Sequence, residues 1–304
     1  MNKRKSVREN YAVFLIPGIV LFAALIVVPF IANIAFSFTR WTGVGEPVWI
    51  GLDNYIRLLD DEVFWMSFRN ILAMIFSMAI VPTVIGLVLA AVLFDYVGRH
   101  VGQRSASAFR AIFYLPQVLP IAIAGIVWGW ILHPTTGALN TALRGVGLDD
   151  LARNWLGDSS IALMSVMFVM IWFQLGYPVV IFMAGLQRVD PSIYEAAELD
   201  GANWYQRFRH VTVPQIRPEI YVVVLTSTIY ALKVFGPIYV LTRGGPANST
   251  NVPSYFAYQN FFERASVGYG ASISTILAVI VIVFAIVFLY AQRRSEAKSG
   301  LVNA

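Results

Sequence analysis

Side chains that could perform chemistry are few in this chain, and their spacing excludes most enzymes. The three histidines, His100, His133 and His210, stand in separate contexts and lack the H-E-x-x-H spacing that places two zinc ligands on one helix face. Neither a G-x-x-x-x-G-K-S/T run for nucleotide phosphates nor a G-x-S-x-G turn for a serine nucleophile occurs. Because the chain has no cysteine, disulfides, thiolate metal sites and cysteine nucleophiles are excluded too. We therefore expect no catalytic residue and no metal site.

Lys233 is the ionisable residue that stands out, because it lies inside an apolar stretch, residues 218–242. It is about nine residues, or about 13 Å of helix, from the outer end of that stretch. A charge left in lipid at such depth costs at least about 2.5–3.5 kcal/mol, so an intramembrane charge is a candidate functional residue. Two interpretations stay open. Lys233 has a structural role, facing a water-filled cavity or bonding carbonyl groups or a partner subunit, or it contacts the substrate or a gate directly.

The composition requires a bilayer around most of the chain. Of the 304 residues, 58% are hydrophobic and 13% are charged, whereas soluble domains carry about 25% charged residues. Six apolar stretches are each long enough to cross about 30 Å of hydrocarbon as a helix of about 20 residues. They cover residues 11–38, 66–94, 109–132, 161–186, 218–242 and 271–291. The sequence thus predicts an all-α polytopic membrane protein with six transmembrane helices.

Lysine and arginine residues indicate which segments face the cytoplasm, because cytoplasmic segments near span ends retain them. They gather in both tails, between the second and third stretches, and between the fourth and fifth: Lys3, Arg4, Lys5, Arg8, Arg99, Arg104, Arg110, Arg188, Arg207, Arg209, Arg217, Arg293, Arg294 and Lys298. We therefore expect two cytoplasmic tails, residues 1–10 and 293–304, and one membrane domain over residues 11–292. These span ends explain the net charge of +5, so no nucleic-acid partner is expected.

The polar segment between the fourth and fifth stretches, residues 187–217, predicts two short amphipathic helices at an angle. Ser192 can cap the first helix with Glu195 reaching back from three residues later, while Pro191 fixes the entry. Gly201 allows the chain to bend before the second helix, and Pro214 ends that helix before the next apolar stretch. A segment of this kind can act as a lever on the cytoplasmic face.

The spacing inside this segment resembles the coupling motif of membrane subunits in binding-protein-dependent ABC importers. It reads Glu195-Ala196-Ala197, three residues, Gly201, nine residues, and then Val211-Thr212-Val213-Pro214. In that family the short helix docks into a cleft of the ATPase subunit. The resemblance therefore implies coupling roles for Glu195, Ala196, Ala197, Asp200, Gly201 and Pro214. Without the resemblance, the segment would be interpreted as an amphipathic helix at the membrane interface.

Other segments resemble the maltose-type carbohydrate importers, and specifically the larger of their two permeases. These are residues 51–55, 137–140, 154–158 and 238–250, and the first two also predict short helices of an outer platform. The resemblance implies the type I importer permease fold, a bacterial or archaeal inner membrane, and no cofactor in this chain. It also implies a second homologous permease, two copies of a cytoplasmic ATPase that binds ATP and Mg²⁺, and an extracytoplasmic sugar-binding protein.

The same resemblance implies substrate contacts in the spans that flank the coupling segment. They fall at Trp172, Gly176 and Val179 before it, and at Ser227, Tyr230, Ala231 and Val234 after it, with Lys233 beside them. Each set follows i, i+3/i+4, i+7 spacing and so lies on one helix face. The two aromatic rings could stack on a sugar ring, but plain helix packing, with Gly176 allowing a close approach, explains such faces equally well. Amides of the maltose-type site are replaced at Ala231 and Val234, which argues against maltose itself.

The sequence therefore predicts a permease subunit of an ATP-driven importer that moves a sugar or oligosaccharide by alternating access. One alternative is an ABC importer of another solute, such as glycerol phosphate, whose anionic group could use Lys233. A secondary transporter is a second alternative, although inverted repeats and buried coupling carboxylates are not found in the sequence. The sequence names neither the solute nor the partner subunits.

The charge asymmetry makes a prediction about membrane topology. A reporter fused after Arg207 should score as cytoplasmic and one fused after Asn251 as external, because the basic residues are concentrated on the side of Arg207. Paired alkaline phosphatase and green fluorescent protein fusions measure this. The reverse pattern would overturn the assignment of both faces.

Overall fold

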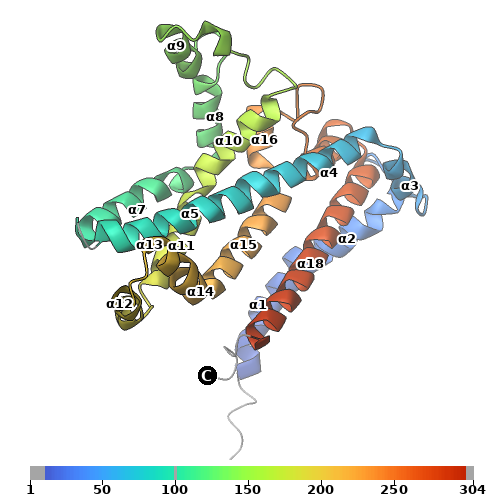
Figure 1. Ribbon diagram of the computed structural model, residues 1–304. Helices are drawn as coiled ribbons and strands as arrows, with labels where there is room; N and C mark the ends of the chain where they lie inside the picture. The colour runs from blue at the N-terminus through green and yellow to red at the C-terminus, as the bar shows by residue number, and fades with distance from the viewer. Residues whose placement is uncertain (1–10, 99–100, 299–304) are drawn as a thin grey trace, which may run out of the picture. The chain divides into compact units, whose positions relative to one another are not determined.

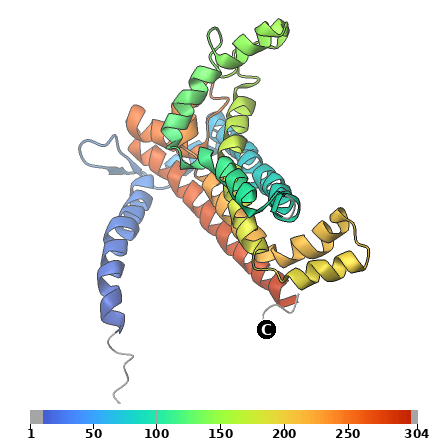
Figure 2. The same cartoon turned by 90° about the vertical axis from the view of Figure 1, so that its left-hand side faces the viewer.

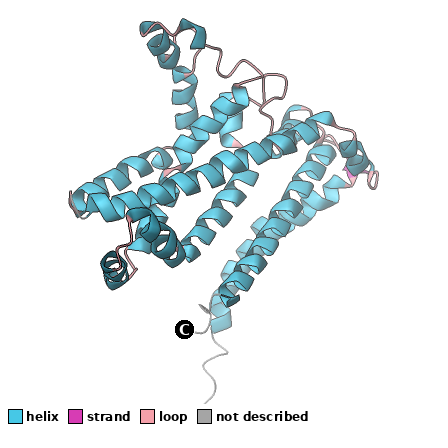
Figure 3. Cartoon of the chain, in the orientation of Figure 1, coloured by secondary structure: helices cyan, strands magenta, loops and turns pink. Residues whose placement is uncertain are grey.

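The computed structural model describes residues 11–98 and 101–298. This part of the chain is helical except for one pair of two-residue strands and the connecting loops (Figure 3). It divides into two compact units. Of the described residues, the first unit contains 11–61 and 257–278, and the second contains 62–98, 101–256 and 279–298.

The first unit begins with three consecutive helical segments that form one apolar span. Its parts are α1 (Tyr11–Phe22), the π-helical turn η2 (Ala23–Val27) and α2 (Val28–Ser37). Residues Phe14–Ser37 together form 24 residues of helix with high hydropathy, and Ser37 at its end is the one buried residue among them. An apolar helix with so little of its surface buried needs lipid or another protein around it.

Polar side chains fix the chain where it leaves this span. The strands β1 (Thr39–Arg40) and β2 (Val48–Trp49) pair antiparallel, and α3 (Asp53–Leu59) follows. The buried Asn54 amide donates to the carbonyls of Ser37 and Thr39, each at 2.9 Å, and so holds α3 against the end of α2. This confirms the short helix expected after residue 51. Leu52, Ile56 and Leu59 are exposed on it, as expected for a helix at the membrane surface.

The second unit opens with a long helix that contains two π-helical turns. It runs through α4 (Glu62–Ile75), η3 (Phe76–Ile80), α5 (Val81–Val92) and η4 (Leu93–Val97). Pro82 lies two residues after the end of η3, and Pro29 lies two residues after the end of η2. Because proline lacks an N–H and crowds the carbonyl four residues before it, a widened turn there lets the helix continue.

The remaining helices of the second unit form further membrane spans and the segments between them. They are α7 (Gln103–Val118), α8 (Ile121–Ile131), α9 (Ala138–Gly145), the 3₁₀ turn η5 (Asp149–Leu151), α10 (Ala162–Gln174), α11 (Gly176–Leu186), α12 (Pro191–Leu199), α13 (Trp204–Arg207), η6 (Phe208–Thr212), α14 (Val213–Gln215), α15 (Arg217–Leu232) and α16 (Gly236–Leu241). The chain then passes through α17 (Pro253–Tyr258) and η7 (Gln259–Glu263) into α18 (Val267–Lys298). In Figures 1 and 2, α9 and α12 lie at opposite ends of this unit.

Four helices of the described chain are long and apolar enough to cross a membrane: Phe14–Ser37, Glu62–Val97, Ala162–Leu186 and Val267–Ser295. The expected third span is a pair, Arg104–Val118 and Ile121–Ile131, bent by 93°. It makes a fifth span if the pair is counted as one. The expected fifth span, residues 218–242, is divided at Lys233–Phe235 into α15 and α16 (Figure 1).

The core of the second unit lies where α5, α11 and α15 pack together. Val179, Phe182, Leu186, Ile216 and Val223 are fully buried in it. Gly176 allows α11 to pack directly on α7, because a Cβ there would lie 2.4 Å from the carbonyl oxygen of Phe113. These contacts hold the ends of α11 and α15 on which the polar segment 187–217 is built.

Candidate functional site

The first helix of the 187–217 segment is capped differently from what the sequence predicts. The carboxylate of Asp190 accepts the backbone N–H of Ser192 at 2.9 Å, and Pro191 occupies the first helical position. Asp190 is therefore the N-cap, and the expected capping box of Ser192 with Glu195 is wrong. Proline suits that first position because its missing N–H needs no partner there. The hydrogen bond from the backbone N–H of Ser192, and to a smaller extent the one from its side chain, hold the pKa of Asp190 below its ordinary value.

A capping box does occur, at the start of the second helix. Asn203 accepts the backbone N–H of Gln206 at 2.9 Å, while the Gln206 side chain accepts the backbone N–H of Asn203 at 2.8 Å. The sequence signal was present, since Gln lies three residues after Asn. Two separately capped helices therefore make up the segment, and Figure 2 shows them side by side as a hairpin.

Gly201 provides the bend between these helices. Its φ is +75°, and the N–H groups of Gly201 and Ala202 bond back to the carbonyls of Glu198 and Ala197, each at 3.0 Å. These two bonds form a Schellman C-cap, which requires a left-handed residue. Asp200 is the C-cap residue of α12. The role expected for Gly201 as a bend is thus confirmed, and its role in coupling stays a prediction.

Two side-chain contacts brace the hairpin from within. The hydroxyl of Tyr194 lies 3.1 Å from Oγ1 of Thr212, and both residues are 1% exposed. Nη1 of Arg207 lies 3.1 Å from Oε1 of Glu198 and joins the second helix to the first. The hairpin can therefore move as one body, because displacing either helix would break a buried contact.

The outward face of the hairpin carries the residues of the motif and several apolar side chains. Glu195, Ala196 and Pro214 are exposed and Ala197 is half-buried. Leu199 is 89% exposed and Tyr205 is 59% exposed. Exposed apolar groups next to a carboxylate make a surface suited to a protein partner.

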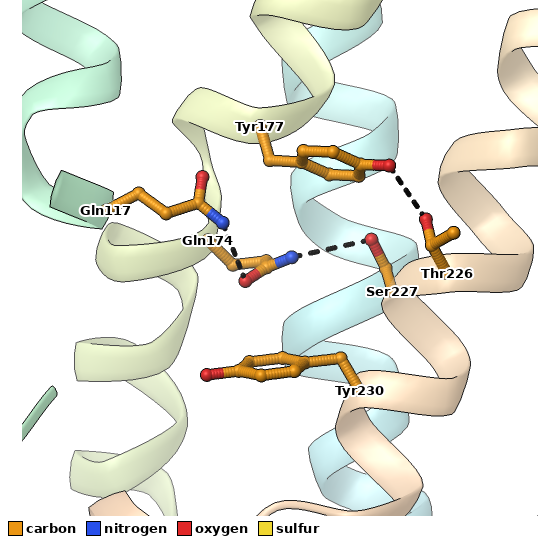
Figure 4. Close-up of a pocket in the computed structure, with 6 residues that line it drawn as sticks. All are labelled: Gln117, Gln174, Tyr177, Thr226, Ser227 and Tyr230. Atoms are coloured by element: carbon orange, nitrogen blue, oxygen red, sulfur yellow. Dashed lines mark hydrogen bonds between the residues drawn. The ribbon is translucent and has the colours of Figure 1, made fainter. Parts of the chain in front are cut away.

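A polar pocket lies among the helices that this hairpin connects. Its volume is about 260 Å³, and Figure 4 shows its lining, which is Gln117 of α7, Gln174 of α10, Tyr177 of α11 and Thr226, Ser227 and Tyr230 of α15. The amide of Gln174 and the hydroxyl of Ser227 lie between the two tyrosine rings (Figure 4). No charged side chain belongs to the lining, all of which falls within the described residues.

Hydrogen bonds fix most of the polar groups of this pocket. Nε2 of Gln117 donates to Oε1 of Gln174, and Nε2 of Gln174 donates to Oγ of Ser227, both at 3.5 Å. The hydroxyls of Tyr177 and Thr226 are 2.9 Å apart. The carbonyl oxygen Oε1 of Gln117 is buried and has no hydrogen-bond partner among the described residues. A buried acceptor of this kind favours a ligand hydroxyl, which would satisfy it.

The structure brings together two of the predicted substrate contacts and places the others elsewhere. Ser227 and Tyr230 line the pocket. Trp172 packs edge-on against Trp128, with ring centroids 5.3 Å apart, and Gly176 packs on α7 as described. Val179, Ala231 and Val234 are buried at 0%, 0% and 4% exposure, and Lys233 is exposed at the end of α15. Substrate contact by any of these residues stays a prediction.

The family assignment follows from comparison with known proteins. The family described as "Binding-protein-dependent transport system inner membrane component" matches residues 83–298. The chain belongs to this family. The probable ABC transporter permease protein YurN of Bacillus subtilis (strain 168) is 36% identical over 268 residues, which cover 88% of this chain and 90% of YurN. The chain is therefore an ABC transporter permease, a multi-pass membrane subunit, which confirms the expected family.

Two further relatives extend the comparison. The diacetylchitobiose uptake system permease protein NgcF of Streptomyces coelicolor is 32% identical over 298 residues, covering 95% of this chain and 84% of NgcF. A solved structure of a bacterial alginate ABC transporter, in complex with an alginate pentasaccharide-bound periplasmic protein, contains a chain that superposes with a TM-score of 0.81. That chain is 22% identical, with 97% of this permease and 98% of that chain covered, so the likeness confirms the importer permease fold.

Sequence reasoning missed four pocket residues of the permease: Gln117, Gln174, Tyr177 and Thr226. A signal was present for the two glutamines, because an amide inside an apolar stretch is costly unless it bonds within the protein. The sequence analysis also did not single out Arg69, which is outside the pocket and lies exposed near one end of the long helix Glu62–Val97.

Among the described residues, no group of three or more histidine or acidic side chains is placed to hold a metal ion.

The conformation of Gly201 predicts a difference between two substitutions in the permease. Gly201→Ala should weaken the end of α12 by about 1–2 kcal/mol, because a left-handed φ is unfavourable for an L-residue. Gly201→Asn should cost less, because asparagine tolerates that conformation. Apart from the two chain neighbours, no atom lies within 4 Å of an added Cβ, so a Cβ at this position meets no clash and the backbone conformation dominates the effect of either substitution.

Amide hydrogen exchange over residues 196–202 of the purified permease measures this difference. Exchange should be about fivefold or more faster in Gly201→Ala than in the wild type, with Gly201→Asn between them. Equal exchange in all three proteins would show that the C-cap does not hold the hairpin.

Proposed function

We propose that this permease carries a neutral saccharide, and that the polar pocket is part of its path. The pocket supports this function because its lining combines two tyrosine rings with amide and hydroxyl groups and lacks charge. Tyrosine rings stack on the apolar faces of sugar rings, while amides and hydroxyls bond the hydroxyl groups around the rim. NgcF, a relative by sequence, is named for the uptake of diacetylchitobiose, a neutral saccharide.

The pocket supports the alternative of an anionic solute less well. Lys233, the cation that such a solute would require, is exposed beyond the end of α15 and is not part of the pocket lining. A phosphate held by uncharged amides alone would lose its solvation without gaining a charge partner. A secondary transporter is no longer an alternative, because the chain belongs to the ABC permease family.

The transporter we infer contains more than this chain. It pairs the permease with a second homologous permease, two copies of a cytoplasmic ATPase that binds ATP and Mg²⁺, and an extracytoplasmic sugar-binding protein. The family description, with its dependence on a binding protein, supports the last partner. Both termini and the hairpin face the cytoplasm in this arrangement, in agreement with the basic residues around them.

Coupling in this transporter runs through the hairpin. Glu195, Ala196, Ala197 and Leu199 would contact the ATPase, and closure of the ATPase pair would move the hairpin as one body. The buried contact of Tyr194 with Thr212 and the ion pair of Arg207 with Glu198 hold the hairpin together and transmit that movement to α11 and α15. Because these two helices also carry Tyr177 and Ser227, movement of the hairpin would reshape the pocket.

The pocket predicts how substitutions should rank in transport. Gln174→Leu and Tyr230→Ala should each weaken uptake by about fivefold to a hundredfold, since each removes a polar group or stacking ring from the pocket. Lys233→Met should have less effect, because a neutral sugar needs no cation. Radiolabelled uptake of a panel of neutral di- and trisaccharides, and of glycerol 3-phosphate, in proteoliposomes of the matched transporters measures the ranking.

The ATPase activity of the same preparations is the control for correct assembly, and each variant should retain it. An inverted ranking, with Lys233→Met the most damaging and glycerol 3-phosphate the transported solute, would replace the saccharide with an anion. Normal saccharide uptake by both pocket variants would show that the pocket is a packing feature.

The docking face of the hairpin predicts a graded loss of coupling. Glu195→Lys should lower uptake by about tenfold or more, because it reverses the charge at the proposed interface. Glu195→Gln, the matched control, keeps the shape of the side chain and should retain most uptake. The measurement is uptake per ATP hydrolysed by the reconstituted transporter. If Glu195→Lys keeps wild-type coupling, the face carrying the motif is not the docking face.

A further inference from the structure

An apolar groove opens on the second unit and has no part in the polar pocket. Val224, Thr228 and Leu232 of α15 form one wall, Ile280, Phe284 and Phe288 of α18 form another, and side chains of α4 and η3 complete it. Its volume is about 510 Å³, and Thr228 is the one residue with a polar side chain in its lining. Leu72, which also lines it, is 66% exposed, so the groove is open to the surroundings.

The length and the lining of the groove suit a hydrocarbon chain. Val224 and Leu232 are eight residues apart, or about 12 Å along the helix. The lining is apolar except for Thr228, so it offers packing contacts to hydrocarbon and few hydrogen bonds.

One end of the groove leads to a group of arginines. The ring of Phe288 contacts the ring of Tyr221, with centroids 6.2 Å apart, and the Tyr221 hydroxyl donates to Oγ of Ser295 at 3.0 Å. Cζ of Arg217 lies 5.8 Å from the centre of the Tyr221 ring. Arg293 and Arg294 directly precede Ser295 and are exposed, as Arg217 is. Three guanidinium groups thus lie toward one end of the groove: Arg217 at the start of α15, and Arg293 and Arg294 near the end of α18.

The charge at this end is not neutralised by the nearest acid on α15. Glu219 is paired with Arg188. Val224 follows Arg217 by seven residues, so the groove begins about 10 Å from the arginines along the helix. A lipid with its head group at the arginines would place its chain in the near part of the groove, around Val224 and Phe288, within the roughly 15 Å depth of one leaflet.

We propose that this groove binds an acyl chain of an anionic phospholipid whose head group contacts Arg217, Arg293 and Arg294. The apolar lining selects the chain, and the arginines select the negative head group. Each arginine near a membrane surface contributes about fivefold to the binding of an anionic lipid. The site is independent of the saccharide pocket, so the failure of either proposal leaves the other intact.

The test uses the intact transporter, reconstituted in equal amounts of phosphatidylglycerol and phosphatidylcholine and then re-extracted in detergent. Mass spectrometry of the retained lipid should show enrichment of phosphatidylglycerol in the wild type. The variant R217Q/R293Q/R294Q should lower that enrichment by about tenfold or more. Arg104→Gln, which removes an exposed arginine that is far along the chain from the groove, should leave it unchanged. Equal retention of both lipids by the wild type, or unchanged enrichment in the triple variant, would overturn the proposal.

A second measurement identifies the occupant directly. The chain has no cysteine, so Thr228→Cys places one thiol in the groove for a benzophenone cross-linker. Irradiation should yield adducts with phospholipid, and competition by added phosphatidylglycerol should reduce labelling of a chain-modified lipid probe. A cross-link to the second permease in place of lipid would show that the groove is a subunit interface and would contradict the proposal.

Discussion

Backbone hydrogen bonding within a bilayer is the constraint on which this structure depends. Lipid offers no partner to a free N–H or C=O group, so spans must be helical, and breaks are tolerated where protein or a wet cavity surrounds them. Two expected spans of this permease break, at Leu119–Pro120 and at Lys233–Phe235. Gln117 lies just before the first break and Tyr230 just before the second, and both line the polar pocket. The pocket therefore lies where the backbone most needs polar surroundings.

The same helices that carry the pocket also carry the hairpin. Tyr177 stands near the start of α11, about 14 Å of helix from Leu186, and Ser227 stands about 15 Å of helix from the start of α15. Val179, Phe182, Leu186, Ile216 and Val223 pack between these points without exposure. Because a close-packed core resists deformation, we infer that movement at the hairpin reaches the pocket as a shift of whole helices.

The sequence predicted much of this architecture because its signals are local. Hydropathy located the membrane helices, and proline, glycine and amphipathic spacing located the hairpin and its bend at Gly201. Two errors have physical causes. Ser192 and Asp190 can both cap a helix, and the choice depends on a backbone geometry that composition does not reveal. The breaks inside residues 109–132 and 218–242 depend on tertiary surroundings that hydropathy does not measure.

The pocket was predicted less completely than the helices. Ser227 and Tyr230 were found, but Trp172 packs against Trp128, and Gln117 and Gln174 were missed. Helical periodicity shows which residues share a face, yet it does not show which face meets which neighbour. The pocket forms because α7, α10, α11 and α15 meet in the tertiary structure. This packing brings together Gln117 and Gln174 from spans that are separate in the sequence.

Water access to the pocket tests the central claim, that a polar path lies within the helices of this permease. Thr226→Cys would place a thiol in the pocket, and Leu72→Cys would place a matched thiol in the apolar groove. A membrane-impermeant charged thiol reagent requires water and a thiolate. The account predicts that the Thr226→Cys transporter is modified and is protected by the transported saccharide, while the Leu72→Cys transporter is not modified. Modification of neither thiol, or modification that the saccharide does not slow, would contradict it.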